Sequence, residues 1–350
     1  MSNTHHILVT GNGFDLYHGL KTNYQDFLTA AGQIEEKPED QRTKWEQKIF
    51  TLCIQNGFFR YFQKGMAIEN DWNGFEAELE KIVTVFIDFF KKLEEQKKEP
   101  QFDISRYSIF CESFSYYELR VFQQFFRLFE QIYDDLSGGL FKIRQDYITD
   151  GRELNQKGMI QELCRELDNF TRSLGLYLSH CAEPKNCTAR WEKLLELQPD
   201  YVINFNYTDT CRLYDIPREQ IFYAKGRADS QPLNMILGIP NDSQDNLDFI
   251  YFKNYFQNII RFTGIPDKQQ LYPTDSQGLP VPVITHIFGY SMPTGDEMII
   301  RQLETASRQM IIYYTDQEDY ARKVISLIRL FGKEAALEKI QTGKFTLTAI

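Results

Sequence analysis

The sequence ILVTGNGFDLYHGLKTNYQDF, residues 7–27, begins as a β-branched apolar run and breaks at two glycines, Gly11 and Gly13. The run predicts a short buried strand over residues 6–10. The glycines allow a tight backbone turn, and a carboxylate, Asp15, follows two residues later. In a parallel sheet, a turn at the carboxyl end of a strand is a place where backbone amides bind phosphate. The same turn is also compatible with a strand that ends without any ligand, with Asp15 capping the next helix.

A long middle section of the chain has a helical pattern. The chain contains 28 Phe and 20 Tyr, and in its first half apolar side chains such as Phe75, Leu79 and Phe86 recur at helical spacing. Because large rings bury much area, we predict that residues 29–195 form an aromatic-rich, all-α insertion. The helical patterns cover residues 42–63, 75–93, 118–136 and 159–179.

After residue 195, strand patterns alternate with helical ones, which favours a mostly parallel sheet. We therefore predict an α/β, Rossmann-like fold, in which residues 1–28 plus 196–350 form a nucleotide-binding domain around the helical insertion. The polar stretch 240–280 predicts a long surface excursion, and helices are expected at 317–331 and 333–341. Strands are predicted at residues 200–205, 220–224, 234–239, 281–290 and 309–315, and in the tail KFTLTAI, residues 344–350.

Composition and charge exclude several classes of protein. The formal net charge of −10 disfavours broad binding to nucleic acid. The cysteines form no CxxC pair and the histidines no HExxH, so we expect reduced thiols and no metal site. The N-terminus lacks the pattern of a signal peptide, and no uncharged apolar run approaches the ~18–20 residues that span a bilayer. We expect a cytoplasmic protein with no membrane partner.

Two further strand ends carry polar or glycine residues. Asn204 and Asn206 lie in INFNYTDT, residues 203–210, where alternation sends both side chains to one face. This pair is compatible with a turn, a helix cap or a binding site. A later strand ends at Gly289 and Ser291, and Asp296 opens the following helix. Because the carboxyl ends of parallel strands meet at one edge, we expect all three endings to converge on a single site.

Several segments together resemble the AbiH-type bacteriophage abortive-infection family. They extend over nearly the whole chain in the order of that family, and the first is the most specific. The resemblance implies a bacterial antiphage protein. The matching segments are GNGFDLYHGLKTNYQDF at 11–27, DWNGFEAELE at 71–80, INFNYTDT at 203–210, HIFGYSMPTGDE at 286–297 and MIIYYTDQEDYARKVISLIRLFG at 310–332.

A more distant resemblance links the chain to sirtuin-like NAD-binding domains. Residues 204–208 are similar to the TxNxD strand end of that group, with Asn206 at the position of the catalytic Asn, and residues 289–291 are similar to its GxS strand end. The resemblance implies a nucleotide ligand, with NAD as the leading candidate. The residues expected to bind it are Gly11, Asn12, Gly13, Phe14, His18, Asn204, Gly226, Gly289, Ser291 and Asp296.

The chain departs from both patterns at two positions. Lys225 precedes Gly226 where the sirtuin-like pattern has His, and Tyr290 stands where the AbiH family commonly has His. A lysine at its ordinary pKa stays charged, so Lys225 acts as a base only if burial lowers its pKa, and otherwise it suits phosphate binding. His18 or Asp15 is the substitute candidate for the base.

Two functional readings follow from these residues. In the first, the chain is an NAD(+) glycohydrolase-type enzyme, with Asn206, Asp15 and Lys225 as catalytic residues. In the second, the site is catalytically degenerate, and the chain senses a nucleotide or acts as a scaffold that recognises a phage or host protein. A homo-oligomer is compatible with either reading.

Overall fold

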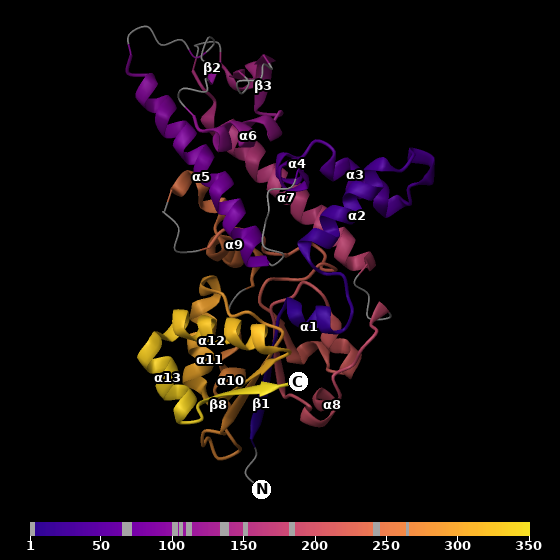
Figure 1. Cartoon of the computed structure of the whole chain (residues 1–350), viewed down its shortest axis with the longest axis vertical. Coiled ribbons are helices and arrows are strands. Elements are labelled where there is room, and N and C mark those ends of the chain that lie inside the picture. The colour runs from indigo at the N-terminus through magenta and orange to yellow at the C-terminus, as the bar shows by residue number, and fades with distance from the viewer. Residues whose placement is uncertain are drawn as a thin grey trace. The chain divides into compact units, whose positions relative to one another are not determined.

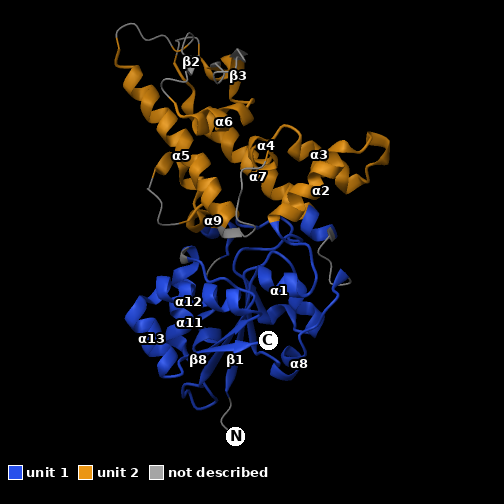
Figure 2. Ribbon diagram, viewed as in Figure 1, with its two compact units in different colours: residues 1–23, 177–236, 258–350 blue, residues 24–176, 237–257 orange. Residues whose placement is uncertain are grey.

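The computed structural model describes residues 4–64, 72–99, 104, 108–109, 114–133, 140–149, 153–181, 186–240, 246–263 and 266–350. These residues fall into two compact units, which Figure 2 colours separately. Unit 1 comprises residues 1–23, 177–236 and 258–350, and unit 2 comprises residues 24–176 and 237–257. The predicted domain boundaries, at residues 28/29 and 195/196, stay a prediction.

Unit 1 is built on a six-stranded sheet in the order β6-β5-β1-β7-β8-β9. Every neighbouring pair in it is parallel, which confirms the predicted α/β, Rossmann-like fold. The first strand of the chain lies at the centre, between strands from the second half (Figure 1). The strands are β1 (His5–Thr10), β5 (Tyr201–Asn204), β6 (Ile221–Tyr223), β7 (Val283–Phe288), β8 (Ser307–Tyr314) and β9 (Phe345–Ala349).

Helices cover both faces of this sheet. Alternation along β1 sends Ile7 and Val9 into one core cluster and Leu8 into another. The cluster around Leu8 includes residues of α1 (Asn12–Tyr17), α8 (Glu192–Leu197) and η5 (Thr210–Tyr214). The opposite cluster includes residues of α10 (Lys268–Leu271), α11 (Glu297–Ala306), α12 (Gln317–Phe331) and α13 (Lys333–Gln341).

The strand order reverses at the centre of the sheet. From β1 the chain adds β5 and β6 on one side, then returns to place β7, β8 and β9 on the other side. The switch point therefore lies between β1 and β7. In open α/β sheets, ligands bind outside the carboxyl ends of the strands at such a point.

Unit 2 is packed through aromatic rings, as the phenylalanine stripes predicted. Phe75 stacks on Phe62 with ring centroids 4.4 Å apart and on Phe170 at 5.6 Å. A second group surrounds Phe122, which lies 4.9 Å from Phe129. The helices are α2 (Tyr24–Glu36), α3 (Lys44–Cys53), α4 (Gly57–Gln63), α5 (Trp72–Gln96), α6 (Tyr116–Gln124), most of α7 (Gln156–Cys181), η7 (Leu247–Phe252) and the first half of α9 (Asn254–Arg261).

The insertion over residues 29–195 is mainly helical but not all-α as predicted, and the single helix predicted over residues 118–136 is wrong in its second half. α6 ends at Gln124, and residues 129–133 form β3 of a three-stranded antiparallel sheet in the order β2-β4-β3. Phe129 reaches the aromatic core from a strand as well as it would from a helix, so ring spacing alone did not discriminate between the two. Residues 134–136 lie outside the described residues. The other strands are β2 (Ser108–Ile109) and β4 (Leu140–Ile143).

The strand predicted at residues 234–239 is also wrong. Only Ile239 forms an isolated bridge, to Lys253. The apolar run is buried, but its backbone groups bind loop and side-chain partners instead of a ladder. Ile236 N donates to Lys225 O at 2.8 Å, and the Gln257 amide binds both backbone groups of Leu237.

Within the part of the chain that the structure describes, every helix is too short or too polar to cross a lipid bilayer.

Candidate functional site

The three strand ends singled out in the sequence are neighbours in the sheet. Thr10, the last residue of β1, is in register with Asn204 at the end of β5 and with Phe288 at the end of β7. The three strand ends therefore lie at one edge of the sheet, as expected, while their function as a single binding site stays a prediction. All side chains described in this subsection belong to unit 1.

Asn204 holds the turn that follows β5. Its Oδ1 accepts hydrogen bonds from Thr10 Oγ1 at 3.0 Å and from the backbone N–H of Asn206 at 2.9 Å. Its Nδ2 donates to Thr208 O at 2.9 Å. Asn204 is buried, and these bonds engage both ends of its amide. Of the readings left open by the sequence, the structure supports an Asx-type turn that ties β5 to β1.

Asn206 joins the ends of β5 and β1. Its Nδ2 donates to Gly11 O at 2.8 Å, although the two residues are 195 positions apart in the chain. The amide of Asn206 therefore meets the glycine turn through its nitrogen. This bond places the predicted catalytic Asn directly beside the first glycine.

Asp15 is buried in the first turn of α1, with 1% of its surface exposed. Its Oδ2 accepts a hydrogen bond of 2.5 Å from Thr208 Oγ1. Its Oδ1 has no hydrogen-bond partner among the described residues. Burial raises the pKa of Asp15 to about 6, while nearby hydroxyl and amide groups, first that of Thr208, act in the opposite direction. Asp15 and Asn206 therefore lie in one polar cluster.

His18, three residues after Asp15, is part of the buried interior. It is fully buried, and its Nδ1 lies 2.6 Å from Phe14 O, so Nδ1 carries the proton and donates to that carbonyl. Nε2 then accepts from the hydroxyl of Tyr214. Burial lowers the pKa of His18, which favours the neutral ring. Both ring nitrogens thus have partners, while the roles predicted for His18 and Phe14 stay predictions.

Contacts within the chain explain why glycine occupies positions 11, 13 and 289. Gly13 N donates to Gly289 O at 2.7 Å, so the turn after β1 rests directly on the end of β7. A Cβ on Gly13 would approach Gly289 Cα to 2.9 Å, and one on Gly11 would approach Tyr290 Cα to 2.7 Å. Gly289 has φ +66°, and a Cβ there would overlap Phe14 N. Close backbone packing at the switch point accounts for all three glycines.

Lys225 forms an ion pair beside the glycine contact. Its Nζ lies 3.0 Å from Asp296 Oδ1, and both side chains are mostly buried. The other carboxylate oxygen of Asp296 accepts from Tyr290 OH at 2.8 Å. The ring of Tyr290 stacks on Phe205, with centroids 4.2 Å apart and an interplanar angle of 15°. Tyr290 therefore links the Lys225–Asp296 pair to the residue between the two asparagines.

The remaining predicted binding residues lie around this group. Asn12 accepts from Thr22 Oγ1 at 2.7 Å and donates to Asn23 Oδ1 at 2.6 Å, which fixes the start of α1. Gly226 has φ +77°, and a Cβ there would overlap Asn234 O. Ser291 is exposed, and its carbonyl accepts from Ser326 Oγ at 2.8 Å.

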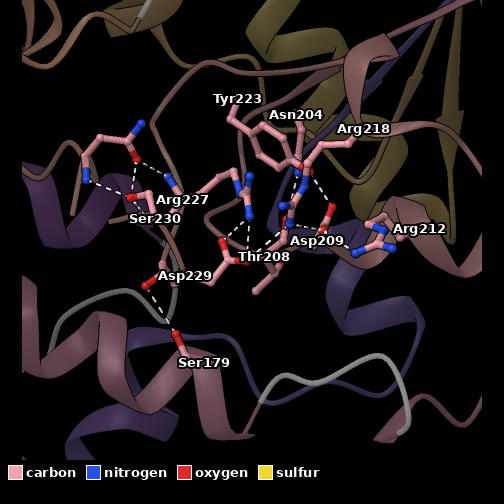
Figure 3. A network of polar contacts seen from close by, with 12 residues as sticks. Ser179, Asn204, Thr208, Asp209, Arg212, Arg218, Tyr223, Arg227, Asp229 and Ser230 are labelled. Atoms are coloured by element: carbon pink, nitrogen blue, oxygen red, sulfur yellow. Dashed lines mark hydrogen bonds and ion pairs between the residues drawn. The ribbon is translucent and has the colours of Figure 1, made fainter. Parts of the chain in front are cut away.

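Sequence reasoning missed a polar network at the ends of β5 and β6, which Figure 3 shows. Asp209 lies at its centre, where it accepts from Tyr223 OH and, at 3.0 Å, from Arg218 Nη2. Arg227 pairs with Asp229 and lies over the ring of Tyr223, with 5.0 Å between Cζ and the centroid. The network fixes the segment that follows Gly226.

Sequence reasoning also missed the hydroxyl partners of Asp15. Thr208 and Thr210 both influence its pKa, and Thr22 does so from the loop after α1. The signal was present in the run NYTDT, where two threonines follow the asparagines. Without the fold, however, nothing connected these hydroxyls to a carboxylate almost 200 residues earlier.

Chemically, the cluster joins a buried carboxylate, a primary amide and hydroxyl groups at the switch point of a parallel sheet. Such groups suit the hydroxyls of a sugar and a positive charge that develops near them. Among the described residues, no group of three or more His, Cys, Asp and Glu side chains has the arrangement of a metal site.

Comparison with known proteins identified one family. The model of the family described as "Bacteriophage abortive infection AbiH" matches residues 7–316. This range contains the turn after β1, the end of β5 and the end of β7. No curated protein and no solved structure matches the chain.

Proposed function

Because the chain belongs to the bacteriophage abortive infection AbiH family, we propose that it acts against phage by binding a nucleotide such as NAD and hydrolysing its N-glycosidic bond. The family description supports the antiphage role. The ligand and the reaction are our proposal. The proposed site is the carboxyl edge of the sheet in unit 1, at the switch point between β1 and β7, where open α/β sheets bind their ligands.

One observation carries the proposal. Asp15 is a buried carboxylate whose Oδ1 is unengaged among the described residues, and it lies in the same cluster as Asn206. A buried polar oxygen without a partner is costly, and such groups are found more often where function requires them. With a pKa of about 6, Asp15 is mostly ionised at neutral pH.

The proposed chemistry assigns different roles to the two residues. Cleavage of an N-glycosidic bond develops positive charge on the ribose, and a nearby negative charge stabilises it, most strongly where water is excluded. Asp15 supplies this charge from its buried position. Asn206 orients the ribose or the attacking water through its side-chain oxygen, because its nitrogen is held by Gly11 O.

The phosphates of the ligand require positive groups nearby. The backbone amides of Gly13 and Phe14 donate within the chain, to Gly289 O and Gly11 O. We therefore assign phosphate binding to Lys225, which would exchange part of its ion pair with Asp296 for the ligand. Ser291, exposed on the same rim, provides a further hydroxyl.

The test is incubation of the purified chain with NAD, followed by chromatography for nicotinamide and ADP-ribose. We expect Asp15→Asn and Asn206→Ala to lower turnover by about 100-fold or more, which corresponds to the loss of a directed electrostatic interaction. Glu318→Gln is the matched control, because that carboxylate is 83% exposed. The absence of product from the unaltered chain, with and without phage lysate, would overturn the enzymatic proposal.

A second candidate function is a nucleotide sensor or scaffold without turnover, which recognises a phage or host protein. Lys225 favours it, because the lysine is paired with Asp296 and stands where the sirtuin-like pattern, which the chain resembles only distantly, has a His. Calorimetry that detects NAD binding without release of nicotinamide would support this candidate. A Lys225→His variant that gained turnover would indicate that the site has lost an ancestral activity.

A further inference from the structure

β9 forms one edge of the six-stranded sheet and pairs with β8 on its inner side. Met310 N donates to Lys344 O at 2.8 Å, and Ile350 N donates to Tyr314 O at 3.1 Å. The backbone groups of even-numbered residues therefore face β8. Because alternate residues of a strand point their N–H and C=O groups to opposite sides, those of Phe345, Leu347 and Ala349 face outward. No described residue pairs with these outward groups.

This edge lacks the features that usually prevent strands from pairing across molecules. Residues 345–350 contain no charged residue and no proline, and the register with β8 shows no bulge. The opposite edge of the sheet is different, since β6 has only three residues. Natural sheets protect exposed edges against pairing with other chains by short strands, charges, prolines or bulges. An edge without this protection therefore indicates a partner strand.

We propose that β9 pairs with β9 of a second copy of this chain, antiparallel and around a two-fold axis at Leu347. The pairing joins two six-stranded sheets into one continuous sheet. A two-fold interface uses the same patch on both copies, so the strand must complement itself.

The register at Leu347 satisfies this condition. It places Leu347 opposite its own copy and Phe345 opposite Ala349, so each outward residue meets an outward residue. In an antiparallel ladder each such pair exchanges two N–H···O=C bonds, which engages every outward group of the three residues. Large Phe345 faces small Ala349, and Thr346 faces Thr348. No like charges meet along the strand.

One exposed apolar side chain directly follows β9, and another lies on the helix that packs against it. Ile350, directly after β9, is 42% exposed, and Leu337, on the helix α13 that packs against β9, is 44% exposed. Pairing of the strands brings the second copy close to Ile350, which adds apolar burial to the hydrogen bonds.

The first test is the molar mass of the full chain in solution by sedimentation velocity over a range of concentrations. We expect a dimer. We expect Leu347→Pro to raise the dissociation constant of that dimer by about 100-fold, because the Leu347 N–H of each copy, one at either side of the central pair, is lost. The N–H of Leu347 faces away from β8, so the substitution removes no bond within the sheet. Proline is tolerated on edge strands in this orientation.

The second test does not depend on how well the proline variant folds. In the proposed register, position 346 of one copy faces position 348 of the other. The double variant Thr346→Lys with Thr348→Lys places like charges opposite each other and should be monomeric. The double variant Thr346→Lys with Thr348→Glu places opposite charges there and should remain a dimer. The two variants share the change at position 346, so they differ only in the sign of one charge.

Several results would overturn the proposal. A monomer at tens of micromolar for the unaltered chain excludes a stable pairing of β9. A dimer that persists in the double-lysine variant uses another surface, and loss of the dimer in both double variants contradicts the register at Leu347.

Discussion

Two buried carboxylates, one in each unit, share the same local chemistry. Asp15 in unit 1 and Glu166 in unit 2 are 1% and 2% exposed. Each has one oxygen that accepts a short hydrogen bond, 2.5 Å from the Thr208 hydroxyl and 2.6 Å from Gly57 N. The other oxygen of each has no partner among the described residues. Burial raises the pKa to about 6 for Asp15 and to about 8 for Glu166.

Their surroundings are different. Asp15 lies at the carboxyl edge of a parallel sheet, among hydroxyl and amide groups that stabilise its charge. Glu166 lies in the middle of α7, where it binds the first residue of α4 and where the nearby charge of Glu162 raises its pKa further. The pKa of Glu166 is displaced more, yet of the two only Asp15 lies at the carboxyl edge of the parallel sheet, the position at which open α/β sheets bind ligands. A displaced pKa therefore indicates a functional site only together with its position in the fold.

The largest loss of stability should come from replacing the glycines near the two carboxylates. We expect Gly289→Ala to lower the free energy of unfolding by about 4 kcal/mol or more, because its Cβ overlaps the backbone of Phe14 at a positive φ. Gly57→Ala, beside Glu166, should cost about 2 kcal/mol, because its Cβ meets a ring, that of Phe125, and rings shift more easily than backbone.

Urea titration measures both variants, with Gly343→Ala as control. Gly343 also has a positive φ, but nothing lies within 4 Å of its Cβ position, so we expect a cost of about 1 kcal/mol. Trp191, buried against Phe288 in unit 1, reports on the first variant by fluorescence. Equal costs for Gly289→Ala and Gly343→Ala would contradict the close contact at the switch point.

The next effect is the pH dependence of stability. A carboxyl group whose pKa is higher in the folded than in the unfolded chain makes the folded state bind protons more tightly, so stability falls as pH rises between the two values. For Glu166 this window runs from 4.5 to about 8. Glu166→Gln should remove the fall and stabilise the chain by about 2–4 kcal/mol at pH 8.5, with little change at pH 4.

Asp15→Asn provides the counterpart in unit 1. Its window runs from 3.8 to about 6, so we expect a smaller gain, about 1–3 kcal/mol at pH 7. Under the proposed function this more stable variant is inactive, whereas Glu166→Gln keeps its activity. Loss of activity in both variants would remove the distinction between the two carboxylates. Thermal denaturation at several pH values, with turnover measured on the same samples, makes the comparison.

The smallest effect concerns the hydroxyl that binds Asp15. Thr208→Val keeps the shape of the side chain but removes the 2.5 Å hydrogen bond, so it should destabilise the chain by about 1–2 kcal/mol at pH 7. It should also move the pKa of Asp15 further upward. Thr208→Ser, which retains the hydroxyl, should show little of either effect. The pH profile of unfolding distinguishes the two variants.

Where local pattern and global fold agree, the sequence predicted the structure closely. α12 spans residues 317–331, as its apolar period and the glycine that follows it indicated, and Asp316 caps its start. Residues 129–133 and 234–239 were predicted wrongly, because short apolar runs fit a strand, a helix or a buried loop equally well. Contacts with residues far away in the sequence decide which of these three structures forms.

In the candidate site, too, some features could be predicted from the sequence and others could not. The meeting of three strand ends followed from the rule for parallel sheets, since every carboxyl end lies at one edge. The contact of Gly13 with Gly289 and the bond of Thr208 to Asp15 did not follow. Each joins residues roughly 190 or more positions apart, and only the register of the strands brings them together.

The central place of β1 has a consequence during synthesis. Its residues Ile7, Leu8 and Val9 are synthesised before the other five strands of the sheet and are fully buried in the finished sheet. The strand beside it ends 194 residues later, at Asn204. At about 5–20 residues per second, β1 waits on the order of 10–40 s for its first neighbour. During that time an apolar, unpaired segment is exposed on every nascent chain, so the efficiency of folding depends on what shields those few residues.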